Sequence, residues 1–389
     1  MKKIVLAYSG GLDTSCLIRW YKDKGFEVIA FMADVGQGSD FEKIEKRALA
    51  TGASKVYIED IKKEFVTDYV FPALKAGAVY EGKYYLATAL SRPIIAKHQV
   101  RIALKEKADA IAHGCTGKGN DQVRFEVTAR LLAPKLEVLA PLRTWEFKTR
   151  EEEIDYALRH KIPIDVTKKS PYSTDINLFG RSIECGVLED PWHEPPEEIY
   201  YMTKDPLKCP NKATYVEIEF KSGVPVKVNG KVYAPVDLIN KLNQIGGANG
   251  VGRVDMVENR LVGIKSREIY ENPAGAIMHA AHADLESLVL DRETLHYKQL
   301  VAPKYAELTY YGLWETPQKK QLDAYVNETQ KRVTGTVRVK LFKGNCIVVG
   351  RKSPYSRYKE TLATYGDKDK FDQKLSEGFV RLWGLPFEE

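Results

Sequence analysis

Residues 7–15 form a glycine turn whose residue types suit the binding of an anion. They read A-Y-S-G-G-L-D-T-S and lie between an apolar run at 4–6 and a helical pattern. Gly10 and Gly11 permit a positive φ and a close backbone approach, while the Asp, Thr and Ser at 13–15 favour the start of a helix. The first amides of such a helix point outward and attract phosphate. The sequence therefore predicts a phosphate site at this turn.

The spacing of this turn distinguishes it from two common nucleotide-binding loops. Residues 7–15 match neither G-x-x-x-x-G-K-[ST] nor G-x-G-x-x-G. The pattern S-G-G-x-D-[ST] instead resembles the loop of the adenylating ATP pyrophosphatases, which cleave ATP between its α and β phosphates and hold the departing pyrophosphate. An ordinary turn is the alternative, but the position directly after the first strand favours a nucleotide site.

The first part of the chain alternates strand and helix patterns. Strand-like runs lie at 3–8, 27–33, 54–58, 108–113 and 136–140, and helical patterns lie at 13–24, 41–51, 61–74, 91–107 and 120–132. This repeat predicts a parallel α/β sheet with helices on both faces. Because ligands bind at the carboxyl ends of parallel strands, the loops after Tyr8, Ala33 and His113 should meet at one crevice.

Two of these loops carry further glycine and polar residues. The sequence A-D-V-G-Q-G at 33–38 would let an adenine or ribose lie against the backbone, although a plain turn explains it equally well. The loop at 114–121 opens the next helix with Asn, Asp, Gln and Arg side chains. A turn alone does not require four side chains of this kind, so we expect this loop to contact substrate.

From about Lys168 the pattern changes to an α+β domain. Strands are expected at 216–220, 225–228 and 231–233 with an Asn229-Gly230 turn, helices at 236–244, 274–290, 292–313 and 318–332, and a hairpin at 334–349. We therefore expect a nucleotide-binding domain over 1–167, a second domain over 168–365 and a C-terminal helical arm over 366–389.

The arm carries one apolar stripe. Phe371, Leu375, Phe379 and Leu382 fall on one face of a helix expected at 367–383. That face needs a neighbour, which is either its own domain or another subunit.

Composition narrows the class of protein. The 389 residues contain 59 Lys and Arg against 53 Asp and Glu, a net charge of +6 without a basic block, which favours small anionic ligands over nucleic acid. Apolar runs of about 18 residues or more are absent, as is a signal segment, so we expect a soluble cytoplasmic protein without membrane contact. Five cysteines with no C-x-x-C spacing indicate reduced thiols.

Three other features have ordinary explanations. His279 and His282 with Asp284 have the spacing of metal ligands but lie among alanines, so no metal site is predicted. Glu184-Cys185-Gly186 is similar to the cysteine signature of sulfonucleotide reductases but lacks a following His. Helical spacing indicates core or subunit packing rather than base stacking for a group of aromatic residues, namely Tyr297, Tyr305, Tyr310, Tyr311, Trp314 and Tyr325.

Five motifs together closely resemble the argininosuccinate synthases, from Met1 to the arm. They lie at 7–15, 33–38, 113–126, 170–182 and 252–271. The resemblance implies a nucleotide-binding domain of the adenine nucleotide alpha hydrolase type, followed by a synthetase and multimerisation domain. It also implies a homotetramer that ligates citrulline to aspartate through a citrullyl-adenylate, with Mg²⁺ bound to the ATP and with AMP and pyrophosphate as products.

The same resemblance assigns site residues. The ATP site comprises Ala7, Tyr8, Ser9, Gly10, Gly11, Leu12, Asp13, Thr14, Ser15, Ala33 and Gly114. The aspartate site comprises Thr88, Thr116, Asn120 and Asp121, and the citrulline site comprises Tyr84, Asn120, Arg124, Ser173, Ser182, Glu258 and Tyr270. Ala89 departs from the pattern, because some family members carry a serine there that helps to bind citrulline; we expect altered detail and the same substrate.

Two carboxylates are the catalytic candidates. Asp13 either faces Mg²⁺ or caps the helix, and Asp121 either takes a proton from the aspartate amine or places a favourable charge at a helix N-terminus. Released phosphate is the alternative proton acceptor.

Other functions compatible with the first turn are less well supported. A tRNA thiolase could use Cys115 and Cys209, but the motif at 252–271 counts against it. A glutamine-dependent synthetase would need an ammonia-generating domain, and a nucleotide-sensing module would leave the second domain without a purpose.

Overall fold

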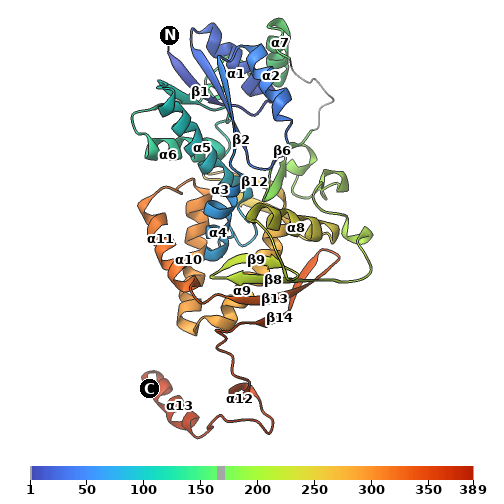
Figure 1. The fold of residues 1–389 in the computed structure, drawn as a ribbon, viewed down its shortest axis with the longest axis vertical. Coiled ribbons are helices and arrows are strands. Elements are labelled where there is room, and N and C mark those ends of the chain that lie inside the picture. The colour runs from blue at the N-terminus through green and yellow to red at the C-terminus, as the bar shows by residue number, and fades with distance from the viewer. Residues whose placement is uncertain (1, 164–170, 389) are drawn as a thin grey trace.

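The computed structural model describes residues 2–163 and 171–388. The expected domain boundary at 167–168 and the first residue of the motif at 170–182 lie outside the described residues. The N-terminal domain occupies one end of the molecule and the second domain the other, with the C-terminal arm beyond it (Figure 1). Within the described ranges, no helix has both the length and the apolar character required to cross a membrane.

A parallel sheet forms the N-terminal domain. Its five strands run in the order β3-β2-β1-β4-β5, with β1 (Lys3–Ala7), β2 (Glu27–Asp34), β3 (Lys55–Asp60), β4 (Ala110–Ala112) and β5 (Glu137–Leu139). The expected parallel sheet is confirmed, although β4 and β5 are shorter than expected. Because β1 pairs with β2 on one side and with β4 on the other, the strand order reverses at β1, where open α/β sheets bind ligands.

Helices cover both faces of this sheet. They are α1 (Leu12–Asp23), α2 (Phe41–Thr51), α3 (Lys62–Glu64), α4 (Phe71–Ala76), α5 (Ala87–Lys105), α6 (Asp121–Leu132) and α7 (Arg150–Arg159). Alternate residues of β1 separate the two faces, because Ile4 and Leu6 pack with Leu17 of α1 while Val5 packs in the cluster that contains Ile94 of α5.

Some helix boundaries differ from expectation. The helix expected at 91–107 begins at Ala87, directly after Leu86 in a left-handed conformation (φ 66°). The one expected at 61–74 is a continuous series of α3, a π-helical turn at Phe65–Val70 and α4. Helix α7 was not predicted, although Thr149 and Glu152 form a capping box at its start.

The second domain contains an antiparallel sheet and four long helices. The sheet order is β10-β9-β8-β13-β14, with β8 (Thr214–Lys221), β9 (Val224–Val228), β10 (Lys231–Val232), β13 (Gly335–Phe342) and β14 (Asn345–Lys352). The helices are α8 (Pro235–Ala248), α9 (Pro273–Val289), α10 (Arg292–Tyr310) and α11 (Pro317–Gln330). These elements agree with the expected α+β pattern, and Asn229 and Gly230 both have the positive φ of a type I′ turn.

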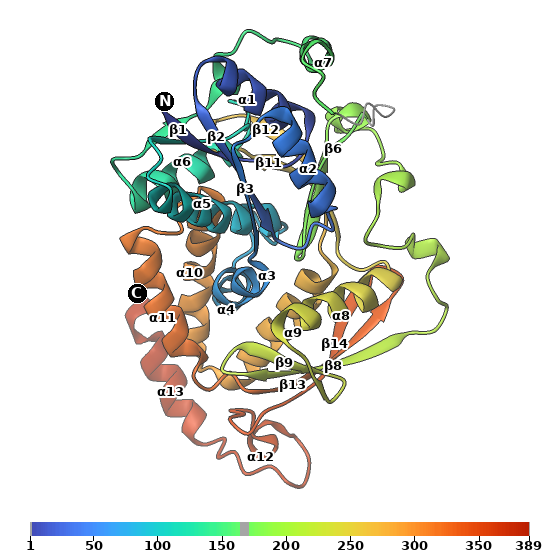
Figure 2. The same cartoon turned by 45° about the horizontal axis from the view of Figure 1, so that its top comes forward.

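A second antiparallel sheet was not predicted. It runs in the order β11-β12-β7-β6, with β6 (Ser173–Asn177), β7 (Gly180–Glu184), β11 (Arg253–Asn259) and β12 (Lys265–Glu271). Its strands carry many Ser, Asp, Glu and Arg side chains, so they lack the apolar signal by which strands are recognised in a sequence. In Figure 2, β6, β11 and β12 lie at the height of the N-terminal strands β1, β2 and β3, above the sheet of β8, β9, β13 and β14.

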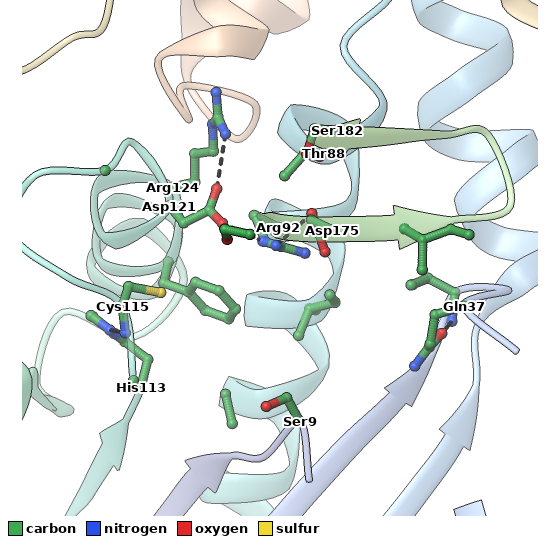
Figure 3. A pocket seen from close by; sticks show the side chains of 18 of the residues that line it. Ser9, Gln37, Thr88, Arg92, His113, Cys115, Asp121, Arg124, Asp175 and Ser182 are labelled. Atoms are coloured by element: carbon green, nitrogen blue, oxygen red, sulfur yellow. Dashed lines mark hydrogen bonds and ion pairs between the residues drawn. The ribbon is translucent and has the colours of Figure 1, made fainter. Parts of the chain in front are cut away.

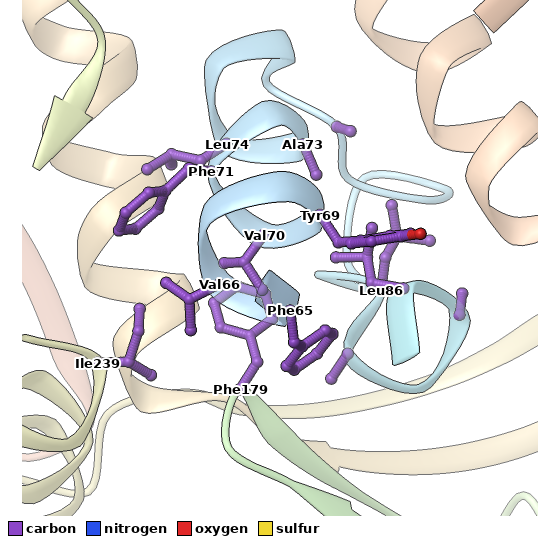
Figure 4. Close-up of a cluster of buried hydrophobic side chains, with 14 of the residues drawn as sticks. Phe65, Val66, Tyr69, Val70, Phe71, Ala73, Leu74, Leu86, Phe179 and Ile239 are labelled. Carbon is purple, nitrogen blue, oxygen red and sulfur yellow. The ribbon is translucent and has the colours of Figure 1, made fainter. Parts of the chain in front are cut away.

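One apolar core joins the two domains. Phe65, Tyr69 and Val70 of the π-helical turn pack in the same cluster as Phe179, which follows β6, and Ile239 of α8 (Figure 4). All five side chains are buried. This shared core fixes the polar sheet relative to the parallel sheet.

The C-terminal arm extends away from the rest of its own chain (Figure 1). It contains α12 (Glu360–Ala363) and α13 (Leu375–Gly384), so the main helix begins eight residues later than expected. Phe379 and Leu382 are 60% and 74% exposed, and Phe371 and Leu375 are exposed as well. The apolar stripe therefore has no cover within the described part of this chain.

Candidate active site

A cavity of about 690 Å³ lies between the parallel sheet and the polar sheet. The loops after β1, β2 and β4 all line it, which confirms that they meet at one crevice. The polar sheet contributes the facing wall (Figure 3). Chain segments far apart in sequence thus surround a volume that suits a small-molecule site.

The first turn has the geometry of an anion site. Gly10 has φ +78°, and a Cβ there would come within 2.6 Å of Ile44 Cγ2. The first intrahelical bond of α1 is donated by the Ser15 amide to the Gly11 carbonyl (3.1 Å), and Gly11 provides no side-chain cap. The amides at the start of α1 are consequently free of intrahelical bonds and can bind phosphate oxygens.

Two carboxyl groups lie beside this turn. Asp13 lies close enough to Glu153 of α7 to influence its charge, and burial together with Asp13 raises the pKa of Glu153 to about 8. Glu153 Oε2 is buried and has no hydrogen-bond partner among the described residues. Across those residues, no group of three or more His, Cys, Asp or Glu side chains is placed to hold a metal, so any ion here would need ligands from the substrate.

The second loop is held in a defined shape. Gln37 accepts a hydrogen bond from the Val35 amide and donates one to the Ala33 carbonyl, both at 2.8 Å. Phe31 and Phe41 line the neighbouring part of the cavity. An apolar wall beside an ordered backbone is suited to a purine ring.

The third loop is held by a polar network. Gln122 Nε2 donates to the carbonyls of Gly117 and Gly119, and Arg143 Nε donates to Gln122 Oε1 at 2.8 Å. Arg143 also pairs with Glu126. The loop thus depends on residues of α6 and of the segment after β5.

The polar sheet presents alternate side chains to the cavity. The strand register places Tyr270, Ser182 and Asp175 directly opposite one another on β12, β7 and β6. Residues opposite each other share a face, as do residues two apart, so Ser173 lies on the same face as this row. The register of β11 against β12 adds Glu258 to this face. The four residues assigned from this part of the chain therefore come together.

Glu258 is enclosed by hydroxyl groups. Tyr270 donates to its Oε2 at 2.6 Å and Tyr310 donates to its Oε1 at 2.5 Å. The Tyr310 hydroxyl also accepts from Asn120 Nδ2 at 2.8 Å. Burial raises the pKa of Glu258 despite these bonds. Tyr310 therefore links two expected site residues from behind the cavity.

Four alternating charges cross the cavity (Figure 3). Arg124 Nη1 pairs with Asp121 Oδ1 at 2.9 Å, Arg92 Nε pairs with Asp121 Oδ2 at 2.8 Å, and Arg92 Nη2 pairs with Asp175 Oδ2 at 2.6 Å. Burial alone would raise the pKa of Asp121, but the two guanidinium groups outweigh it and lower the pKa. Asp121 is thus an ionised carboxylate with both oxygens occupied, which makes it a weak proton acceptor.

Most of the expected site residues line the cavity, and the exceptions all belong to the first turn. The cavity lining omits Gly10, Gly11, Leu12 and Ser15. Ser15 is fully buried, and its hydroxyl is 3.1 Å from that of Tyr8. The Tyr84 hydroxyl accepts hydrogen bonds from the backbone amides of Thr88 and Ala89. Ala89, which departs from the family pattern, thus contributes its backbone amide.

Three residues in contact with these groups are not predicted from the sequence. They are Arg92, Asp175 and Tyr310, the last of which is expected in packing alone. Two signals were present: Arg92 follows Thr88 by one helical turn, and Asp175 is two residues from Ser173 and so shares its strand face. Nothing in the local sequence connects Tyr310 to Glu258.

Known proteins identify the class of this fold and site. The description "Arginosuccinate synthase N-terminal HUP domain" matches residues 3–163, and "Arginosuccinate synthase C-terminal domain" matches residues 172–389. The fold is thus that of an ATP-using synthetase with a HUP domain.

Full-length relatives specify the family. Two relatives are 58% identical to this chain over its whole length: the argininosuccinate synthases from Acetivibrio thermocellus and Carboxydothermus hydrogenoformans. The matched regions include 96% and 97% of those two proteins. The argininosuccinate synthase from Caldanaerobacter subterraneus is 60% identical over 99% of this chain and 94% of its own. The chain belongs to the argininosuccinate synthase family and is an enzyme, which argues against a nucleotide-sensing module.

Solved structures give a much weaker likeness. A 4-thiouridine synthetase–RNA complex with bound ATP is 19% identical over 41% of this chain and 40% of its own, with a TM-score of 0.30. A TM-score this low does not support a thiolase function.

The phosphate turn gives a direct test. Gly10→Ala would place a Cβ against Ile44 at a positive φ, so we expect ATP affinity to fall about tenfold or more. Gly25→Ala is the matched control, because Gly25 has φ +81° but nothing within 4 Å of its Cβ position. Calorimetric titration with ATP should show the loss only for Gly10→Ala, and equal affinities in the two variants would contradict the anion site.

Proposed function

We propose that this enzyme activates L-citrulline with ATP as a citrullyl-adenylate and transfers the activated carbon to L-aspartate, releasing pyrophosphate and then AMP. The observation that carries the proposal is the single cavity in which the phosphate turn faces the polar sheet. Ligation of citrulline and aspartate in arginine biosynthesis follows from the family. The intermediate and the products are inferred from the site.

ATP is proposed to lie along the carboxyl edge of the parallel sheet. Its β and γ phosphates bind the amides that follow Gly10, and its adenine lies against the loop that begins at Ala33. Ser9, Thr14 and Gly114 line the path between these two ends. This orientation directs the α-phosphorus toward the polar sheet.

Mg²⁺ is the metal that the family resemblance implies. Asp13 and Glu153 fit it, because carboxyl oxygens are ligands that Mg²⁺ accepts and Glu153 Oε2 has no other described partner. The bound ion would neutralise charge on the phosphates. Asp13 and Glu153 would hold it together with phosphate oxygens.

The first step needs placement more than a protein base. The neutral ureido oxygen attacks the α-phosphorus, a new P–O bond forms, and the bond to the β phosphate breaks. Amides at the start of α1 then stabilise the leaving pyrophosphate.

In the second step the aspartate amine attacks the adenylated carbon. A C–N bond forms, the carbon–oxygen bond to AMP breaks, and the amine loses a proton. Because Asp121 is held ionised by two arginines, the released pyrophosphate is the better acceptor for that proton. Asp121 is instead proposed to bind aspartate, together with Thr88, Thr116 and Asn120.

Citrulline is proposed to occupy the polar sheet face. Glu258 is buried, so its negative charge is costly unless a positive charge lies beside it. The ammonium group of citrulline would provide that positive charge. Arg124 provides a guanidinium at the neighbouring edge, and hydroxyls complete the site. The proposed set is Tyr84, Asn120, Arg124, Ser173, Ser182, Glu258 and Tyr270.

The arm is proposed to assemble a homotetramer. Exposed apolar side chains on α13 would be covered by another subunit, since the described part of their own chain leaves them exposed.

Product analysis tests the proposed function. With labelled ATP, AMP and pyrophosphate should accumulate only when ATP, Mg²⁺, citrulline and aspartate are all present. Omission of each component in turn is the control. Formation of ADP, or equal ATP cleavage without citrulline, would contradict the proposal.

Tyr310→Phe tests the citrulline site. Loss of the hydroxyl leaves Glu258 and Asn120 without a shared partner, so we expect the KM for citrulline to rise about tenfold with little change in the KM for ATP. Tyr305→Phe is the matched control, because Tyr305 is buried on the same helix and bonds Asp323 away from the cavity. An unchanged citrulline KM in Tyr310→Phe would remove Tyr310 from the site.

Removal of residues 366–389 tests the arm. Sedimentation velocity should show a smaller species than the full chain, because the apolar stripe is lost. Phe379→Asp should have the same effect with the arm still present. A truncated protein that remains tetrameric would refute this role.

A further inference from the structure

The charges that cross the cavity belong to both domains. Asp121 begins α6 beside the third loop, whereas Asp175 lies on β6 of the polar sheet. Arg92 of α5 reaches both with different nitrogen atoms, Nε to Asp121 and Nη2 to Asp175. Its side chain is only 16% exposed. A single guanidinium thus connects the proposed aspartate site to the wall proposed for citrulline.

The connection is supported by the packing around it. Five residues before Arg92, the carbonyl of Ala87 accepts a hydrogen bond from Asn177 Nδ2 at the end of β6. The start of α5 therefore rests on the strand that carries Asp175. Burial would lower the pKa of Arg92, but Asp121 and Asp175 outweigh it and raise the pKa, so the guanidinium stays charged.

The charge of the second substrate makes this residue important. L-Aspartate carries two carboxylates and one ammonium, yet the aspartate set of Thr88, Thr116, Asn120 and Asp121 contains a carboxylate and no cation. Among the described residues that line the cavity, Arg92, Arg124 and Arg260 carry permanent positive charge. Arg260 pairs with Glu184 and Glu268 instead, which leaves Arg92 and Arg124 beside Asp121.

Removal of Arg92 would change the net charge of the four side chains that cross the cavity. Arg124, Asp121, Arg92 and Asp175 together carry two positive and two negative charges. Without Arg92 the group has an excess negative charge, and Asp175 loses its ion-pair partner. An incoming dicarboxylate would then be repelled inside a partly buried site, where charges interact more strongly than in water.

We propose that Arg92 is a positioning residue for the second step: it holds Asp121 and Asp175 in place and balances their charge, so that aspartate can bind beside the activated citrulline. This inference rests on the proposed function. The first step does not require bound aspartate, so adenylation should proceed without Arg92.

Arg92→Gln separates the two steps. We expect the KM for aspartate to rise about tenfold or more, because a buried charge loses its partner. Citrulline-dependent exchange of labelled pyrophosphate into ATP, measured without aspartate, should stay within about twofold of the unmodified enzyme. Asp175→Asn should show a smaller rise in aspartate KM, and Arg92→Lys should recover part of the loss because it restores the charge without the fork.

Arg101→Gln is the matched control. Arg101 lies on the same helix and pairs with Glu59 at an exposed position, so its loss should change neither measurement. Thermal denaturation of each variant reports on folding, and Asp175→Asn keeps the test decisive if Arg92→Gln is unstable.

Each outcome decides one point. An unchanged aspartate KM in Arg92→Gln and Asp175→Asn overturns the role of Arg92. Equal loss of exchange and of aspartate use also overturns it, because the residue would then support the whole fold. If the unmodified enzyme shows no citrulline-dependent exchange, the adenylate of the proposed function fails, while the aspartate KM still tests Arg92.

Discussion

The contact between the polar sheet and the carboxyl edge of the parallel sheet determines the rest of this structure. The Leu178 amide, just after β6, donates to the Val35 carbonyl at 2.8 Å. The chains approach so closely that a Cβ on Gly36 would lie 2.7 Å from Leu178 Cβ. This glycine therefore has a function beyond its positive φ. Without this approach, the phosphate turn and the wall proposed for citrulline would not share a cavity.

Burial of charge in that cavity is possible because nearly every charged group has a partner. An isolated carboxylate at the position of Glu258 or Asp121 would carry a large desolvation penalty. Two tyrosine hydroxyls reduce it for Glu258, and two guanidinium groups reduce it for Asp121. The same partners fix the orientation of these side chains before substrate arrives, which is what differential binding of a transition state requires.

The neighbours of each carboxyl group also determine the direction in which its pKa is shifted. Asp121 is held ionised, whereas Glu153 has a raised pKa of about 8 next to Asp13 at the first turn. The difference arises from the neighbours, since one faces two cations and the other faces a carboxyl group. Two carboxyl groups thus have pKa values shifted in opposite directions by their surroundings.

The sequence by itself determined the parallel sheet, the phosphate turn and the α+β pattern of the second domain. These features depend on local signals, namely apolar periodicity, glycine at a positive φ and helix-start residues, and they need no knowledge of distant contacts. The five motifs also indicated which polar residues belong to one site, because their combination resembles a single family.

Only the tertiary structure decided how that site is assembled. The polar sheet of β6, β7, β11 and β12 has charged strands that give no apolar signal, so it becomes recognisable only when its strands pair. The roles of Arg92, Asp175 and Tyr310 arise from contacts between residues 29 to 190 positions apart in the chain. Such contacts depend on how whole domains pack, and no local pattern of residues encodes them.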